Sequence, residues 1–391
     1  MTQVSDAASR WGSSGLAWLT GSPDGRPDFS RAGVLARAEQ VAAVLGARLD
    51  ISVDAAALLA GRAGLLGLSR RGRIAAGGGT RLLPARDGWC ALTLSRPDDI
   101  AALPALLAVD DMPADHWTAL QHWAAPRLVS TIVERAALLD IPAAGLAEIC
   151  AAPPRVHRIA APAAAPGFAG LLVADLSSMW AGPLCGQLLA RAGATVIKVE
   201  SPRRPDGTRL GSRDFFDWIN GGKLSYCLDF DRDADELRAL LAVADVVIEG
   251  SRPAALARRR LGPDHIAPRP GRIWLRISGY GQPSTRPAFG DDAAVAGGLV
   301  GAGSDGPVFC GDAIADPLTG LEAAAAVAES LSRGGGELIQ VSMADTAARY
   351  AALPLTGPAE NCPAQPPQAP PRGSPPVPSR RPGPPRGRRS T

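Results

Sequence analysis

The stretch GDAIADPLTG, residues 311–320, places Asp316 directly before a proline and an alanine-rich run. Two interpretations of this carboxylate are open. Asp is a favoured N-cap residue and proline at the first helical position loses no needed hydrogen bond, so Asp316 can simply start a helix. A carboxylate there also lies beside backbone amides that favour negative charge, which suits attack on an activated acyl group such as a thioester. Both interpretations predict a helix from Pro317 to about Arg333, ended by GGG at 334–336.

Other reactive residue types form no comparable pattern. The cysteines and histidines are scattered, without the spacing of metal ligands or of a catalytic triad. We therefore expect no metal site. The residues concerned are Cys90, Cys150, Cys185, Cys227, Cys310 and Cys362, with His116, His122, His157 and His265.

Composition and charge indicate a globular protein whose 391 residues suit two domains or one large one. Lys198 and Lys223 are the only lysines, and the net charge of +3 depends on the arginine-rich C-terminus, so we predict no nucleic-acid surface on the folded part. The first residues lack the features of a signal peptide, and no apolar run is long enough for a bilayer. We expect a cytoplasmic protein with reduced thiols and no membrane contact.

Changes in composition divide the chain into five parts. We predict a helical segment over 1–70, a small α+β domain over 71–150, a proline- and alanine-rich linker over 151–168, a large domain over 169–356, and a tail over 357–391. So much proline and so few apolar residues cannot form a core, and we expect the tail to be disordered, with a polybasic binding tail as the alternative.

A weak internal similarity leaves two interpretations of the first segment. Residues 13–28 resemble residues 295–312, and each precedes an alanine-rich helix. Alignment on the Asp-Gly pairs places Leu35 opposite Asp316. The segment is either a degenerate repeat that serves as scaffold or a separate element whose similarity arises by chance.

Strand and helix patterns alternate regularly in the large domain. Such alternation is typical of βαβ units on a parallel sheet, so we predict an α/β fold with an open, Rossmann-like, mainly parallel sheet in three layers. The predicted strands are GLLVADLS, ATVIKVE, LSYCLDF, DVVIEG and RIWLRISGYG, and the predicted helices are GPLCGQLLARAG and DADELRALLAVA.

The segment LLVADLSSMWAGPLCGQLLARAGATVIKVESP resembles the opening of the family III CoA-transferases, the group that includes formyl-CoA and carnitine CoA-transferases and the α-methylacyl-CoA racemases. The resemblance covers most of residues 169–346 in the family's order. It implies a Rossmann-like large domain, a smaller domain, and two chains that interlock as a homodimer. Further motifs that carry it are NGGKLSYCLDF, ADVVIEGSRPAAL, RRLG, ISGYGQ, RPAFGDD, DGPVFCGDAIADPLTGLEAA and QVSMADTA.

The same resemblance implies that Asp316 is the catalytic aspartate of a CoA-transferase. Its carboxylate would attack an acyl-CoA thioester, giving an aspartyl anhydride and CoA thiolate. The thiolate would return to form an aspartyl-CoA thioester, and the carboxylate of an acceptor acid would complete the transfer. Coenzyme A is thus part of the substrate, with no tightly bound cofactor. The anhydride must be kept from water.

The resemblance also implies contacts with coenzyme A. Trp180 stands where relatives have a residue near the active site, while Leu228 and Arg260 match positions at the nucleotide end of CoA. Arginine suits phosphate because its planar group donates two hydrogen bonds, although a solvated helix end is the alternative for Arg260. Gly182 and Pro183 are expected to shape the first strand-to-helix turn.

Two departures from the family pattern bear on function. Asp291 stands where the racemases have a histidine, and a carboxylate is a poor substitute for that acid-base group, so racemisation is disfavoured. The part that resembles the small domain, residues 71–150, precedes the large domain instead of following it, as in a circular permutation. Within it, Gly77, Gly78 and Gly79 either cover the intermediate or form a plain surface turn. The alternatives to a CoA-transferase are an acyl-CoA racemase or isomerase, and a non-catalytic member that binds CoA or a partner chain.

Overall fold

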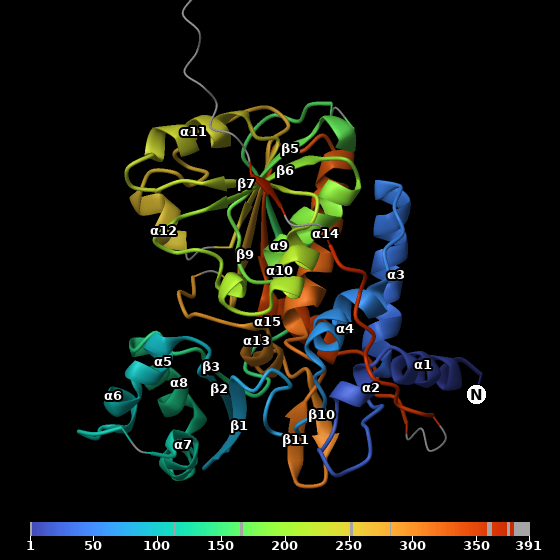
Figure 1. Cartoon of the computed structure of the whole chain (residues 1–391), viewed down its shortest axis with the longest axis vertical. Helices are drawn as coiled ribbons and strands as arrows, with labels where there is room; N and C mark the ends of the chain where they lie inside the picture. The colour runs from blue at the N-terminus through green and yellow to red at the C-terminus, as the bar shows by residue number, and fades with distance from the viewer. Residues whose placement is uncertain are drawn as a thin grey trace, which may run out of the picture.

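Our computed structural model describes residues 2–112, 114–164, 167–250, 253–281, 283–357, 362–373 and 376–378. It contains a large domain, a small domain and a helical N-terminal segment (Figure 1). The strands of the large sheet are β4 (Arg155–Arg158), β5 (Leu172–Asp175), β6 (Thr195–Glu200), β7 (Leu224–Cys227), β8 (Val246–Glu249), β9 (Ile273–Ser278), β12 (Glu337–Ser342) and β13 (Val377–Pro378).

The large sheet has the strand order β13-β7-β6-β5-β8-β9-β12-β4 among the described residues. Neighbouring strands are parallel except β12 and β4, which are antiparallel. The predicted parallel α/β sheet and its five predicted strands are confirmed. Strand β4 differs from our expectation, because it lies inside the segment 151–168 that we predicted to be a linker.

Alternate residues of each central strand face opposite layers. Val173 of β5 and Leu275 of β9 pack with the helices α9 and α14, whereas Ala174 and Trp274 pack with α11 on the other face. Both sets are buried, as expected for a three-layer fold. The helices of the large domain are α9 (Ala181–Arg191), α10 (Arg213–Asn220), α11 (Ala234–Val243), α12 (Pro253–Arg258), α13 (Gly290–Ala296), α14 (Ala315–Ser332) and α15 (Met343–Ala351).

The small domain contains a three-stranded antiparallel sheet covered by short helices, at the lower left of Figure 1. Its core is its own, around Leu92, Leu106, Trp123 and Ile132. Asp292 of α13 ties it to the large domain, since this buried carboxylate accepts a hydrogen bond from Thr93 at 3.0 Å. The elements are β1 (Thr80–Ala85), β2 (Gly88–Thr93), β3 (Ala143–Gly145), α5 (Pro97–Ala101), α6 (Leu103–Leu107), α7 (His116–Ala124) and α8 (Val129–Leu138).

The N-terminal segment packs directly on the large domain. Helix α3 lies beside α14, as Figure 1 shows, and residues of both share one apolar core. The Arg31 guanidinium also donates to the carbonyls of Val300 (2.8 Å), Ala351 (2.8 Å) and Gly298 (3.0 Å). The segment contains α1 (Thr2–Ser13), α2 (Leu16–Leu19), α3 (Ala32–Leu49) and α4 (Ala55–Leu66), and it contacts the hairpin of β10 (Val300–Gly303) and β11 (Gly306–Phe309).

Part of the tail differs from the predicted disorder. Residues 362–373 follow the surface of the helical segment, where the Gln365 N–H donates to the Gly12 carbonyl at 2.9 Å. Glycines make this close approach possible, since a Cβ at Gly64 would lie 2.4 Å from the backbone of Gln368. A proline-rich strand needs no core of its own when it lies on a preformed surface. Residues 379–391 lie outside the described residues.

Candidate active site

Asp316 lies in the first turn of α14 but does not cap it. The helix begins at Ala315, and the residue before it, Ile314, is the N-cap without a side-chain hydrogen bond. The capping interpretation of Asp316 is therefore wrong in detail, although a helix does start there. The side chain is only 9% exposed. A nearly buried carboxylate that caps nothing needs another explanation.

Three helices begin around this carboxylate. The backbone amides of Ala181 in α9 and Gly290 in α13 act on it as hydrogen-bond donors and lower its pKa. The approach is close, because a Cβ added at Gly290 would lie 2.4 Å from Asp316 Oδ2. The carboxylate thus faces the positive ends of two neighbouring helices in addition to its own. Such preorganised donors suit a group on which negative charge must be stabilised.

Burial nevertheless dominates the electrostatics of the site. It raises the pKa of Asp316 to about 7, against the lowering effect of Arg62 and the two backbone amides. Burial and the negative charge of Asp312 likewise raise the pKa of Asp291 to about 7. Two carboxyl groups of the site therefore change charge near neutral pH, which is a common feature of catalytic groups.

Arg62 is the cation that sequence reasoning missed. It comes from α4, and its Nη1 contacts both oxygens of Asp312, at 2.6 and 2.7 Å. Its guanidinium also lies 5.7 Å from the ring centre of Trp180 and 5.5 Å from that of Phe215. Burial lowers the pKa of Arg62, but the adjacent carboxylates outweigh this effect and it stays charged. One signal was available, since Arg62 is the single charge in the apolar run AAALLAGRAGLL.

The structure places Trp180 directly before α9 and beside Arg62, and its contact with a substrate stays a prediction. It is 3% exposed and packs edge-on against Phe215, with ring centres 5.2 Å apart. Its indole Nε1 is buried without a hydrogen-bond partner among the described residues, as is the Thr319 hydroxyl one turn after Asp316. Two unpartnered polar groups close to Asp316 are candidates for contact with a substrate.

The other two predicted CoA contacts are not brought together with Asp316. The Leu228 side chain is buried in the cluster of the opposite layer, so only its backbone is left for a ligand. Arg260 is exposed just after α12, and its carbonyl accepts a bond from Arg238 at 2.8 Å. Leu228 directly follows β7, and Arg260 lies two residues after α12. Their role stays a prediction.

The glycine loop lies beside the site. Gly77 is exposed, and a Cβ there would lie 3.6 to 3.8 Å from the guanidinium of Arg62 and from Asp312 Oδ1. The hydroxyl of Thr80, the residue after Gly79, donates to Asp291 Oδ2 at 3.3 Å. Gly77 therefore lies beside the charged groups of the site, and both interpretations of Gly77, Gly78 and Gly79 stay open.

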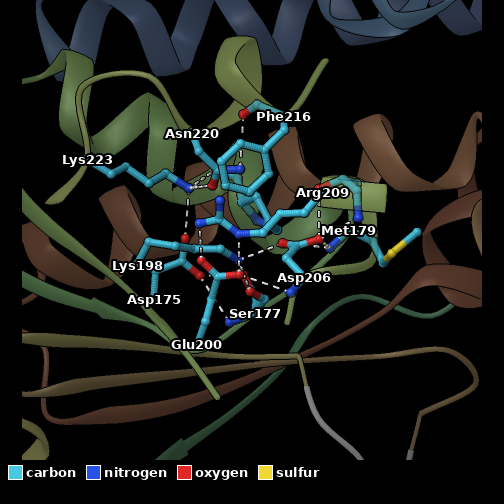
Figure 2. Close-up of polar contacts among 12 residues, drawn as sticks. Asp175, Ser177, Met179, Lys198, Glu200, Asp206, Arg209, Phe216, Asn220 and Lys223 are labelled. Carbon is cyan, nitrogen blue, oxygen red and sulfur yellow. Dashed lines mark hydrogen bonds and ion pairs between the residues drawn. The ribbon is translucent and has the colours of Figure 1, made fainter. Parts of the chain in front are cut away.

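The turn that leads into α9 rests on a buried ionic network, drawn in Figure 2. Gly182 lies within it, since a Cβ there would be 2.2 Å from the Ser177 hydroxyl. Gly182 and Pro183 belong to the first turn of α9, in agreement with the strand-to-helix turn we expected. In the described part of the chain, no cluster of His, Cys, Asp or Glu has the arrangement of a metal site. None of the described helices combines the length and apolar character that a membrane crossing needs.

The chain is similar in sequence to known CoA-transferases. A model of the family described as CoA-transferase family III matches residues 168–375, just over half of the chain. The chain is 34% identical over 171 residues to a succinyl-CoA–L-malate CoA-transferase beta subunit of Chloroflexus aurantiacus, covering 39% of this chain and 42% of the relative. It is 31% identical over 206 residues to a succinate–glutarate CoA-transferase of Agrobacterium fabrum, covering 46% and 52%.

Two further similarities complete this picture. The chain is 37% identical over 117 residues to the alpha-methylacyl-CoA racemase of Homo sapiens, covering 29% of this chain and 28% of the relative. The crystal structure of the hypothetical protein Rv3272 from Mycobacterium tuberculosis matches with 30% identity and a TM-score of 0.44, covering 49% of this chain and 58% of that chain. The chain spans about half the length of the curated relatives it matches.

Proposed function

Because the chain belongs to CoA-transferase family III, we propose that it moves coenzyme A between an acyl-CoA thioester and a carboxylic acid, with Asp316 as the nucleophile. The observation that carries this proposal is the position of the Asp316 carboxylate. It is nearly buried, caps no helix, and faces the first backbone amides of α9 and α13. A carboxylate needs no partner base, because it is already a nucleophile when ionised.

The reaction follows from these groups. The ionised carboxylate of Asp316 attacks the thioester carbonyl, the C–S bond breaks, and CoA leaves as the thiolate. The amides of Ala181 and Gly290 act on the Asp316 carboxylate itself, so they orient the nucleophile in this step and can stabilise the oxyanion that forms on the aspartyl carbonyl in the next one. The thiolate then attacks the aspartyl carbonyl of the anhydride, which releases the donor acid and leaves an aspartyl-CoA thioester. The acceptor carboxylate attacks this thioester, and CoA thiolate finally opens the resulting anhydride at the acceptor's carbonyl.

Arg62 has a defined part in this scheme. Its positive charge favours the ionised form of Asp316, and its own position is fixed by Asp312. Trp180 and the Thr319 hydroxyl offer donors with no partner among the described residues, so we assign them to the acyl group or its oxyanion. We keep the glycines at 77–79 as the loop that covers the intermediate, supported by the position of Gly77 beside Arg62 and Asp312.

The substrates are proposed by chemical class. Several curated relatives carry succinyl-CoA or succinate in their names, so succinyl-CoA is the first donor to test. We keep Leu228 and Arg260 as contacts of the nucleotide end of CoA, supported by the family resemblance. We also propose a homodimer in the cytoplasm and a small domain that precedes the large one in the chain.

The experiment is a trapping assay. The protein is incubated with succinyl-CoA, treated with hydroxylamine or borohydride, digested, and the peptide that contains Asp316 is weighed by mass spectrometry. A modified Asp316 peptide in the parent, absent in Asp316→Asn, supports the proposal. Substrate turnover by Asp316→Asn at the parental rate contradicts it.

One observation favours the racemase as the second candidate. Asp291 has a pKa of about 7, so it can gain and lose a proton near neutral pH although it stands in place of a histidine. Exchange of the α-proton of an acyl-CoA with solvent deuterium, without transfer of CoA, would favour this function. Binding of CoA with neither reaction would indicate the non-catalytic alternative.

A further inference from the structure

The turn of residues 176–183 delivers a donor to Asp316 and is itself under strain. Ala181 begins α9 and packs against the start of α14, since a Cβ added at Gly320, about one turn after Asp316, would lie 2.7 Å from the Ala181 carbonyl. Its backbone amide lowers the pKa of Asp316. Two residues earlier, Met179 has a φ of 74°, in the left-handed region that residues with a side chain rarely adopt. Such a conformation persists only where the surroundings determine it. The surroundings of this turn therefore decide where the Ala181 amide lies.

A first buried ion pair holds the turn at two points. The Lys198 ammonium lies 2.7 Å from Asp206 Oδ2 and donates to the Ser177 carbonyl. The other oxygen of Asp206 accepts from the strained Met179 N–H at 3.1 Å. Figure 2 shows Lys198, Asp206, Ser177 and Met179 close together, with dashed lines for their contacts. Both side chains of the pair are completely buried.

A second buried pair holds the two ends of the turn. The Lys223 ammonium donates to Asp175 Oδ2 at 2.8 Å, to the Pro183 carbonyl at 2.8 Å and to Asn220 Oδ1 at 2.9 Å. Asp175 Oδ1 accepts from the Ser177 N–H at 3.1 Å and from its hydroxyl. This pair is also completely buried. All three donor positions of the Lys223 ammonium are used, so it is fully satisfied.

An outer contact completes the network. Glu200 accepts from the Asp206 N–H at 3.0 Å and from the Arg209 guanidinium at 2.6 and 2.9 Å. The charges lower the pKa of Asp175 and Asp206 even though burial alone would raise it. The lowered pKa values favour the ionised form of both aspartates, while burial lowers the pKa of Lys223 against the raising effect of Asp175.

We propose that Lys198–Asp206 and Lys223–Asp175 are positioning pairs that fix the turn at Ser177, Met179 and Pro183 so that the Ala181 amide faces Asp316. The proposal rests on the function proposed above for Asp316. A buried ion pair is often no better for stability than an apolar pair of the same volume, so stability alone does not explain two of them. Apolar side chains could not hold backbone groups at fixed points. These residues do not touch the substrate; they act through Ala181.

The test compares two double variants. Lys198→Met with Asp206→Leu removes both charges, leaves no unpaired buried charge, and removes the acceptor for the Met179 N–H and for the Thr208 N–H and hydroxyl. Lys198→Met with Asp206→Asn also removes both charges but keeps an amide oxygen as that acceptor. Arg62 and Asp292, which act on Asp316, are the same in both variants, as are Asp291 and Asp312, which act on Arg62. Both variants lose the Lys198 donation to the Ser177 carbonyl, and they differ in whether residue 206 offers an acceptor to the Met179 N–H.

Two readouts are measured at several pH values. The first is the titration midpoint of the Asp316 carboxyl, from ¹³C NMR of protein labelled at the aspartate carboxyl carbon, with Asp316→Asn for assignment. The second is the rate of Asp316 acylation by succinyl-CoA. We expect the Leu variant to fold, its midpoint to rise by about one pH unit, and acylation at pH 7 to fall about tenfold, as for loss of one charge-assisted hydrogen bond. The Asn variant should recover most of both losses.

Several results would overturn the proposal. A parental midpoint in the Leu variant would do so, as would equal losses in both variants that follow only their thermal stability. Failure of the parent to acylate at Asp316 would refute the proposed function, while the midpoint would still test the positioning. If the Leu variant does not fold, hydrogen exchange of the parent decides: the Met179 and Ala181 amides should exchange as slowly as the middle of α9, and fast exchange contradicts the proposal.

Discussion

Replacing the Asp316 carboxylate should stabilise the protein at alkaline pH. The folded chain raises the pKa of Asp316 from 3.8 to about 7, mainly through burial. Between these values the folded protein holds a proton that the unfolded chain has released, so the free energy of unfolding decreases as the pH rises through this window. Above pH 7 Asp316 is ionised in the folded protein too, so the fold bears the full free-energy cost of burying this charge. Asp316→Asn removes that cost because an amide does not ionise.

The magnitude follows from the same values. A difference of about three pH units corresponds to about 4 kcal/mol at pH 8. An amide has one acceptor oxygen where the carboxylate has two, and it carries no charge, so it accepts more weakly from the Ala181 and Gly290 amides, which costs about 1 kcal/mol. We therefore expect Asp316→Asn to raise the free energy of unfolding by about 3 kcal/mol at pH 8 and by less than about 1 kcal/mol at pH 5.

The assay is urea unfolding of the parent and the variant at pH 5 and pH 8, followed by tryptophan fluorescence. Asp24→Asn is the matched control, since Asp24 is exposed and its replacement should change neither value. A variant that is destabilised at pH 8, or whose stability differs from the parent by the same amount at both pH values, would refute the reasoning. If Asp316→Asn loses acylation and gains stability, the Asp316 carboxylate is needed for acylation although it lowers the free energy of unfolding.

Three further predictions test the surroundings of Asp316. Gly290→Ala would place a Cβ 2.4 Å from Asp316 Oδ2 and 2.3 Å from the Ala313 carbonyl, so acylation in the trapping assay should fall at least about tenfold. Gly357→Ala is the control, because a Cβ there would meet no atom within 4 Å and acylation should not change. Arg62→Met should raise the pKa of Asp316 above about 7, so that the pH profile of acylation moves to higher pH and recovers in alkaline buffer; an unchanged profile contradicts the assigned role. Asp292→Ala removes the acceptor for Thr93, Tyr280 and the Phe289 N–H and should cost about 2–4 kcal/mol in urea unfolding, against no change for the exposed Asp98→Ala.

The sequence alone predicted the features that depend on residues close together in the chain. Alternation of strand and helix patterns predicted the parallel sheet, and a motif carried by consecutive residues led to Asp316. Strand β4 was missed because RVHR has no apolar alternation; it is an exposed edge strand that pairs with β12 through its backbone. The order in residues 362–373 was missed because it depends on a surface formed by α1, α2 and α4, far away in the chain.

The site itself was only half predictable, for the same physical reason. Asp316 and Trp180 lie in recognisable motifs, whereas Arg62 and Asp312 meet across 250 positions of sequence. The residues around Arg62 in α4 do not indicate which carboxylate this arginine pairs with. The single charge in an apolar helix indicated a buried partner, and only the packing of α3 and α4 against α14 identified it.

This packing has a consequence for the family assignment. Residues 168–375 carry the match to CoA-transferase family III, yet Arg62 and the glycines at 77–79 come from the preceding part of the chain. A fragment restricted to the matched residues would keep Asp316 and the amides of Ala181 and Gly290 but would lose the cation that favours the ionised carboxylate. It would also leave the buried Asp312 without its charge partner and expose the face of α14 that packs against α3. The proposed nucleophile and the charge that favours its ionised form therefore become one site only when both parts of the chain fold together.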